Sequence, residues 1–161
     1  MRYAATLFTG PLQRGSSVFG NTEIELKAYM VSISTLLKHF RKDFILFTDS
    51  FGKELVESCG IECTIEVRDM TFPKGLWSIP KIDTYRILNN QFIHFDLDSF
   101  LFNPKIIPKD FRILVQNREM RPKDSGYYRM ECLKTMGYKI PELWSKHKDS
   151  TGAALSYNMG V

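Results

Sequence analysis

Short runs of apolar residues alternate with helix-like segments along this chain, and this alternation constrains its fold more than any other feature. The run over residues 44–47 is entirely apolar and ends in Thr48 and Asp49, which is typical of a strand covered on both faces. A second run, Phe92–Phe95, is mostly apolar and ends at Asp96. Strands of this kind usually pair in parallel, and parallel neighbours need a crossover connection, usually a helix. The sequence therefore predicts an α/β fold in which helices flank a mostly parallel central sheet.

The individual elements follow from the same patterns of apolar residues and turn residues. Strands are expected at residues 3–8, 44–49, 63–67, 92–95 and 111–116, and helices at residues 22–39, 51–59 and 78–90. Thr22 and Glu25 have the spacing of a capping box, so we expect Thr22 to cap the first of these helices. Apolar residues cover more than one stripe of that helix, so we expect it to be largely buried.

Length and composition fit a single globular domain over residues 1–161. Of the 161 residues, 43% are hydrophobic and 13% aromatic, which is enough to build a core and excludes disorder or a coiled coil. The net charge of +4 is small and the basic residues are dispersed, so no nucleic-acid partner is expected. No stretch of about 20 apolar residues is present, so no membrane span is expected. Three cysteines, an odd number, indicate reduced thiols and a cytoplasmic location.

Asp96 and Asp98 directly follow the expected strand Phe92–Phe95, at the edge where open α/β sheets bind ligands. Acidic pairs are also common in surface turns, so the motif alone leaves that alternative open. Apolar residues on both sides of the pair favour carboxylates that need a counter-charge, and hard oxygen ligands favour Mg²⁺ or Mn²⁺. His94, inside the strand, is expected to be a core residue with its hydrogen bonds satisfied.

The residues around this acidic pair resemble a known family. Residues 77–88, which include Lys81, followed by residues 92–98, are similar to the lead-in and Asp-x-Asp motif of GT-A glycosyltransferases. The likeness is greatest to the glycogenin-like and galactosyltransferase-like retaining group. It extends over most of the chain in the order of the elements, and it implies a Rossmann-like GT-A domain.

The resemblance also implies roles for particular residues. Asp96 and Asp98 would bind Mn²⁺ or Mg²⁺ on the diphosphate of a nucleotide sugar, by likeness a UDP-sugar, and Lys81 would approach the same diphosphate. The other donor-binding positions that it implies lie after the first two strands and near the C-terminus: Thr9, Gly10, Thr48, Asp49, Asn158 and Gly160.

The function that the resemblance implies is a metal-dependent glycosyltransferase, which passes the sugar to a saccharide or another hydroxyl acceptor. No catalytic nucleophile or base can be assigned from these residues. The segment between Asp98 and Asn158 is longer than in the glycogenin-like pattern. The sequence also ends at Val161, where the family continues into an acceptor-binding half, so we expect an incomplete catalytic domain.

Two other functions remain open at this point. In a haloacid-dehalogenase-like phosphatase, Asp96 would attack phosphorus and Asp98 would act as general acid. Three α/β units precede the motif here, and Phe100 takes the place of the usual Thr or Val, which speaks against that class. The other alternative is a non-catalytic nucleotide-binding fragment. The apolar run at residues 157–161 can leave a sheet edge open to a second chain, which would allow an oligomer.

Overall fold

The protein is described by a computed structural model, which covers residues 1–15, 20–70, 79–89, 91–108, 117–118, 137 and 157–158. The chain divides into two compact units, Met1–Asp110 and Phe111–Val161. In the second unit, β5 (Asn117–Arg118) pairs antiparallel with β6 (Tyr157–Asn158). The strand expected at residues 111–116 lies outside the described residues.

The first unit is built on a parallel sheet of four strands, in the order β3-β2-β1-β4. Its strands are β1 (Arg2–Leu7), β2 (Phe44–Thr48), β3 (Thr64–Val67) and β4 (Phe92–Phe95). Its helical segments are α1 (Gly10–Gln13), α2 (Thr22–Phe40), α3 (Ser50–Ser58), α4 (Ile79–Ile87) and the short 3₁₀ helix η1 (Pro104–Ile106). The predicted α/β fold with a parallel central sheet is therefore confirmed.

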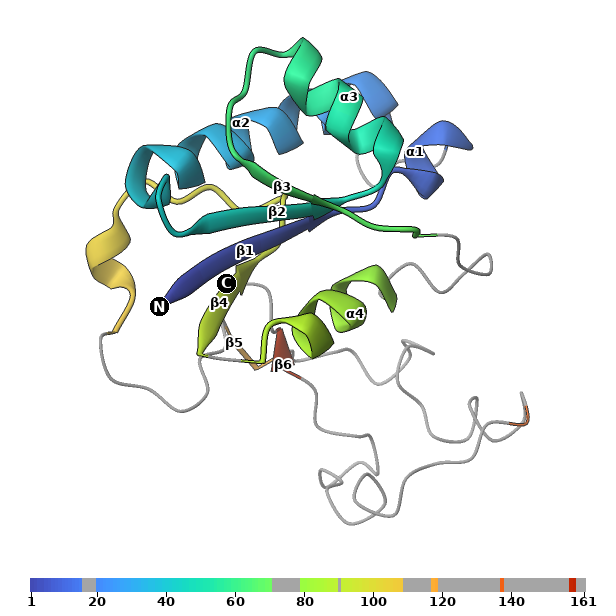
Figure 1. Ribbon diagram of the computed structural model, residues 1–161. Coiled ribbons are helices and arrows are strands. Elements are labelled where there is room, and N and C mark those ends of the chain that lie inside the picture. Colours follow the sequence, from blue (N-terminus) through green and yellow to red (C-terminus); the bar gives the residue numbers. More distant parts are fainter. Residues whose placement is uncertain are drawn as a thin grey trace. The chain divides into compact units, whose positions relative to one another are not determined.

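Helices cover both faces of this sheet (Figure 1), with α2 and α3 on one face and α4 on the other. On the α2 face, Tyr3 of β1 stacks on Phe40 with ring centroids 3.7 Å apart, and Phe40 also lies against Phe95 of β4. On the opposite face, buried Ala4 and Phe47 form one cluster with Leu88, which directly follows α4. Burial on both faces explains why β2 and β4 are almost continuously apolar.

Two expectations about α2 are wrong. Asn21, and not Thr22, caps the helix, because the extended backbone of Asn21 lets its side chain accept hydrogen bonds from the amides of Glu23 and Ile24. The helix is also buried along one face only, since Ile33 is fully buried while Ile24 is 57% exposed. A helix that packs against one side of a sheet buries one stripe, and the remaining apolar residues face solvent.

The end of α3 agrees with expectation. Gly60 follows α3 in a left-handed conformation with φ of 69°, which stops the helix as its position in the sequence predicts. Within the described part of the chain, no helix combines the length and the apolar character that crossing a membrane requires.

Candidate functional site

The strand order reverses between β1 and β4. From β1 the chain moves outward to β2 and β3, and it then returns to place β4 on the other side of β1. Open α/β sheets bind ligands outside the carboxyl ends of the strands at such a reversal. The segments that leave these two ends begin with Phe8 and Thr9 after β1 and with Asp96 after β4.

Lys81 of α4 and Asp96 meet at this position. The Lys81 ammonium forms a close ion pair with the Asp96 carboxylate, and about a quarter of each side chain is exposed. The backbone alternation of β4 explains the meeting, because Asp96 follows Phe95, which packs on the α2 side, and so turns toward α4. The sequence predicted both residues for the site, and the structure brings them together.

Asp98 lies in the turn that follows Asp96 and is exposed. The Ser99 amide donates to the Asp96 carbonyl oxygen at 3.0 Å. Leu97, which separates the two acids in the sequence, has a buried side chain. The Ser32 hydroxyl of α2 donates to the Ser99 carbonyl oxygen at 2.6 Å. The acidic pair therefore sits on a turn that is held to α2.

Two tyrosines face the negative charge of this turn. The pKa of Tyr29 on α2 is raised first by burial, then by its hydrogen bond to the Glu25 carboxylate and by the charges of Glu25, Asp98 and Asp96. The pKa of Tyr85 on α4 is raised by burial and by the charge of Asp96. Both hydroxyls therefore stay protonated at neutral pH beside the acidic turn, and that of Tyr29 donates to the Glu25 carboxylate.

His94 is buried next to the ion pair, and its two ring nitrogens differ. Nε2 lies 2.9 Å from the Thr6 hydroxyl of β1, so this half of the ring is satisfied as expected. Nδ1 is buried without a hydrogen-bond partner and lies 4.0 Å from Oδ1 of Asp96. Burial and then the nearby charge of Lys81 lower the pKa of His94 to about 3, so the imidazole is uncharged at neutral pH.

Two of the predicted donor-binding residues, Thr9 and Asp49, bond to each other. The Asp49 carboxylate accepts hydrogen bonds from the Thr9 amide at 3.0 Å, from the Thr9 hydroxyl at 2.8 Å and from the Gly52 amide at 2.8 Å. The Thr48 hydroxyl donates to the Leu7 carbonyl oxygen at 2.8 Å. Thr9 and Thr48 are fully buried. These groups join the segment after β1 to the segment after β2, and their contact with a nucleoside stays a prediction.

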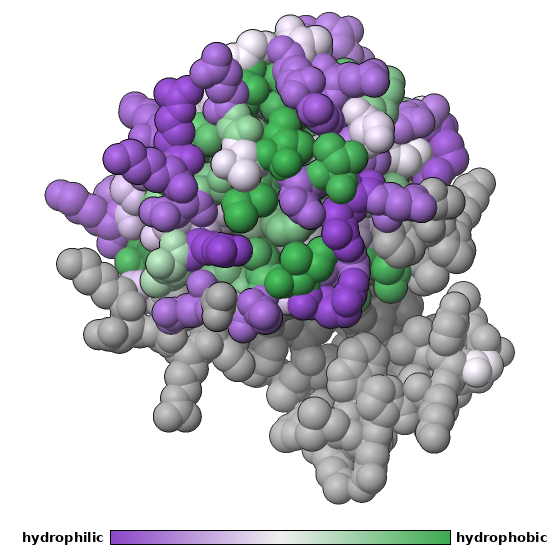
Figure 2. Space-filling view, viewed as in Figure 1, coloured by the Kyte–Doolittle hydropathy of each residue, from purple (hydrophilic) through white to green (hydrophobic). Residues whose placement is uncertain are grey.

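A cleft of about 520 Å³ lies at the carboxyl ends of β1, β2 and β3. Phe8, Phe51 and Met70 supply apolar walls. The charged residues of the lining are two arginines and two aspartates: Arg14, Arg68, Asp49 and Asp69. Phe51 is 45% exposed, so part of its apolar surface is open to solvent. In Figure 2 the described surface of the first unit shows apolar side chains among hydrophilic ones.

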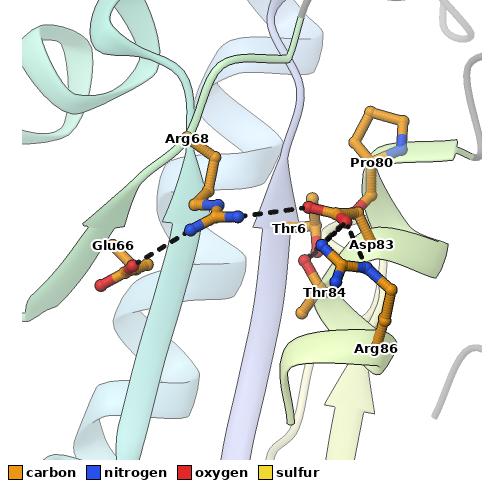
Figure 3. Close-up of polar contacts among 7 residues, drawn as sticks. All are labelled: Thr6, Glu66, Arg68, Pro80, Asp83, Thr84 and Arg86. Atoms are coloured by element: carbon orange, nitrogen blue, oxygen red, sulfur yellow. Dashed lines mark hydrogen bonds and ion pairs between the residues drawn. The ribbon is translucent and has the colours of Figure 1, made fainter.

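This cleft was not predicted from the sequence, although a signal was present. Arg68 follows an expected strand and Arg14 closely follows another, and such positions converge at one edge of a parallel sheet. Of the predicted residues, Gly10 and Asp49 line the cleft. Figure 3 shows Arg68 extending toward α4, where it lies 3.8 Å from the Asp83 carboxylate, while its other amino group lies 3.6 Å from Glu66.

Comparison with protein families gives one match, to a family described as "Family of unknown function (DUF6734)", over residues 1–161. The chain belongs to this family. Comparisons with curated proteins and with solved structures gave no match.

Two predicted positions of this DUF6734 member lie near the C-terminus. Asn158 is in β6 of the second unit, where it pairs with Asn117 across the two-stranded ladder. Gly160 lies outside the described residues.

The fit of a divalent metal to this DUF6734 member can be judged from its carboxylates. Among the described residues, no three His, Cys, Asp or Glu side chains are arranged to hold a metal ion. Asp96 and Asp98 offer carboxylate oxygens, and Mg²⁺ in proteins is often held by one or two carboxylates, with water and substrate phosphates completing its coordination. The two carboxylates therefore suit an ion whose remaining coordination is completed by water or phosphate oxygens, rather than an ion enclosed by protein groups alone.

Proposed function

We propose that this chain binds a nucleoside diphosphate sugar together with Mn²⁺ or Mg²⁺, and that it acts as a glycosyltransferase toward a hydroxyl acceptor. The observation that carries the proposal is the meeting of Lys81 and Asp96 where the strand order reverses. An acidic turn and a lysine at this edge suit a diphosphate, whose charge a bound divalent ion would neutralise as the nucleotide leaves.

The cleft at the ends of β1, β2 and β3 suits the nucleoside in this proposal. Phe8 and Phe51 offer apolar surface for a base, and Arg14 offers positive charge to an anionic ligand. β1 borders both β2 and β4, so the cleft and the acidic turn belong to neighbouring strand ends. A nucleotide sugar has the same order of parts, with an aromatic base at one end and a diphosphate beyond it.

Lys81 has two partners in this proposal. In the absence of ligand its ammonium neutralises Asp96. When Asp96 binds a divalent ion, Lys81 loses that partner and its ammonium can donate to phosphate oxygens as a mobile point charge. Tyr29 and Tyr85 provide neutral hydroxyl groups near the same charges.

The resemblance to the glycogenin-like group supports UDP as the nucleotide and a GT-A fold for the domain. The free thiols of Cys59 and Cys63 support a reducing compartment such as the cytoplasm.

Calorimetric titration of UDP into the whole chain, with and without Mn²⁺, tests the proposal. We expect saturable binding that requires Mn²⁺ and that is lost in Asp96→Asn, which keeps the side-chain shape. Asp43→Asn is the matched control, because Asp43 is exposed just before β2, at the amino edge of the sheet. Absence of binding in the unsubstituted chain, or equal binding in Asp96→Asn, would contradict the proposal.

Hydrolysis of UDP-sugars separates an enzyme from a binding module. Release of UDP that depends on Mn²⁺ and on Asp96 supports the glycosyltransferase. Binding of UDP without turnover of UDP-glucose or UDP-galactose, alone or with saccharide acceptors, would instead favour a non-catalytic nucleotide-binding fragment.

A further inference from the structure

The two outer strands of the parallel sheet differ in exposure. β4 forms one edge and is largely buried, whereas β3 forms the other edge and is exposed at three of its four residues. Within the described part of the chain, β2 is the only strand that pairs with β3 (Figure 1). The outer side of β3 therefore presents backbone groups with which a further strand can pair.

One hydrogen bond shows which backbone groups of β3 point outward. The Arg68 amide, directly after β3, donates to the Thr48 carbonyl oxygen of β2 at 2.8 Å, so the backbone groups of Arg68 face β2. Along a strand these groups alternate in direction from one residue to the next. The amides and carbonyl oxygens of Cys63, Ile65 and Val67 therefore point away from β2.

These outward groups select one register for a second copy of the chain. Two identical strands pair antiparallel about a twofold axis, because the same surface then serves both copies. Residues that exchange both hydrogen bonds lie directly opposite each other. With the axis at Ile65, Ile65 lies opposite its own counterpart and Cys63 lies opposite Val67. No other twofold register pairs all three residues with one another.

In this register the apolar side chains of the two strands meet. Arg68 extends toward α4, where it lies 3.8 Å from Asp83, so the alternate residues Cys63, Ile65 and Val67 lie on the opposite face of the sheet. Cys63 and Ile65 are half-buried, and Val67 is 44% exposed. Pairing would cover the remaining apolar surface of this row.

The charged side chains on the α4 face are complementary in the same register. Glu62 of each copy lies opposite Arg68 of the other, and opposite charges at such positions stabilise a strand pair. Glu62 is 86% exposed and lies 3.3 Å from Arg41, while Arg68 lies 3.6 Å from Glu66 (Figure 3). Exposed ion pairs of this kind contribute little, so both groups can take a partner in the second copy.

We propose that β3 is the surface through which a second copy of this chain binds, by antiparallel pairing of the two β3 strands about a twofold axis at Ile65. Backbone hydrogen bonds supply affinity, and the match of apolar and charged rows sets the register. Val67 and Arg68 also line the cleft, so the second copy brings its Glu62 to the edge of that cleft. The interface does not depend on the proposed function.

Sedimentation equilibrium of the whole chain at concentrations up to about 1 mM tests the interface. We expect a reversible dimer, whose dissociation constant rises at least about tenfold in Glu62→Lys, because like charges then lie opposite each other. Glu23→Lys makes the same change of charge on exposed α2 and should leave the dimer unchanged. A chain that is monomeric at every concentration, or a dimer that is unchanged in Glu62→Lys, would overturn the proposal.

Mixing two variants tests the charge pairs themselves. Arg68→Glu should also weaken its own dimer, since Glu62 then faces a second carboxylate. A mixture of Glu62→Lys chains with Arg68→Glu chains restores opposite charges at both positions, so the two variants should dimerise with each other and not with themselves. Far-ultraviolet circular dichroism checks that each variant folds. A mixture that dimerises no better than its separate components would refute the pairing of Glu62 with Arg68.

Disulfide formation reads the register. Thr64 lies opposite Glu66 of the second copy in a pair without backbone hydrogen bonds, where the Cα atoms are about 4.5 Å apart and a disulfide can form. In a Cys59→Ser, Cys63→Ala, Cys132→Ser background, Thr64→Cys chains mixed with Glu66→Cys chains should therefore cross-link on mild oxidation. Either variant alone should not, because its two thiols are offset along the strands. Cross-linking of one variant alone as readily as the mixture would overturn the register.

Discussion

The Lys81 ammonium on α4 contacts the Asp96 carboxylate just beyond β4, so an ion pair occupies the sheet edge at which a ligand is expected. Each side chain is about three-quarters buried, and a carboxylate withdrawn from water to this extent needs a compensating charge. Lys81 supplies that charge in the structure. A divalent ion that binds Asp96 would therefore compete with Lys81 for the negative charge of the carboxylate.

Replacement of Lys81 by Met should have opposite effects on two ligands. Lys81→Met leaves Asp96 without its counter-ion, so the affinity of the ligand-free protein for Mn²⁺ should rise about three- to tenfold. Affinity for UDP with Mn²⁺ should fall, because the ammonium no longer reaches the phosphates. Calorimetric titration of Mn²⁺ alone, and then of UDP at saturating Mn²⁺, measures both effects.

Lys53→Met is the control for this pair of measurements. Lys53 lies 3.7 Å from Glu57 along the exposed side of α3, so the substitution also removes one ion-paired lysine. Neither affinity should change in this variant. Unchanged or weaker binding of Mn²⁺ in Lys81→Met would show that Lys81 does not compete with a cation at Asp96.

The sheet could be predicted from sequence because its pattern is local. Fully apolar runs such as residues 44–47 indicate strands that are buried on both faces. The helices expected between successive strands indicate that these strands pair in parallel. Lys81, in the first turn of α4, and Asp96, just after β4, were assigned to one site by the resemblance to GT-A glycosyltransferases, and the structure shows that they form an ion pair. The capping residue was missed because Asn21 and Thr22 are both good caps, and backbone geometry decides between neighbours.

The partners of polar groups could not be predicted, because they depend on contacts between distant segments. Thr9 and Asp49 both follow strands and so both look available to a ligand, yet they bond to each other. Thr6 and Thr84 belong to no sequence motif. Only the packing of α4 on β1 places Thr84 beside Thr6, whose hydroxyl lies beside His94. Residue type and strand position locate the edge of a site, while folding decides which polar groups remain free to bind.

Gly52 should not tolerate alanine, although alanine is the better helix former by about 1 kcal/mol. It lies in the first turn of α3, where an added Cβ would overlap the Thr48 hydroxyl oxygen and lie 3.1 Å from Cγ2 of Thr9. Both neighbours are fully buried and cannot move aside. Gly52→Ala should therefore lower the free energy of unfolding by about 1–3 kcal/mol, measured by urea denaturation.

A second substitution tests the cause of this loss. Thr48→Ala removes the oxygen that the new Cβ would overlap, so the double variant Gly52→Ala, Thr48→Ala should lose less stability than the two single losses together. Strictly additive losses would mean that the clash is elsewhere.

Asp49 should be more important for stability than an ordinary helix cap. Its carboxylate accepts from the Gly52 amide at the start of α3 and also from the amide and hydroxyl of buried Thr9. Asp49→Ala leaves these donors without their acceptor, at a cost of about 2–3 kcal/mol in the free energy of unfolding. Urea denaturation compares this loss with that of Asn21→Ala, which removes an exposed cap of α2 and should cost about 1 kcal/mol. Equal losses in the two variants would refute the role of Thr9.

Cys63 should react slowly with thiol reagents at mildly alkaline pH. Burial raises the pKa of its thiol to about 11, from a usual value near 9, so little thiolate is present at pH 8.5 in the folded chain. Cys59 is exposed. Iodoacetamide should therefore label Cys59 well before Cys63, as followed by mass spectrometry in a Cys132→Ser background.

Unfolding should remove the difference between the labelling rates of Cys59 and Cys63. The raised pKa of Cys63 also determines how stability changes with pH. In urea both thiols are solvated, so their labelling rates should converge. The pKa of Cys63 is higher in the folded chain than in the unfolded chain, so the thiol ionises at a lower pH when the chain is unfolded. The contribution of Cys63 to the free energy of unfolding is therefore complete below about pH 9 and is lost as pH approaches 11. Cys63→Ala should accordingly weaken the fall in stability over that interval. Labelling of Cys63 as rapidly as Cys59 in the folded protein would contradict its burial.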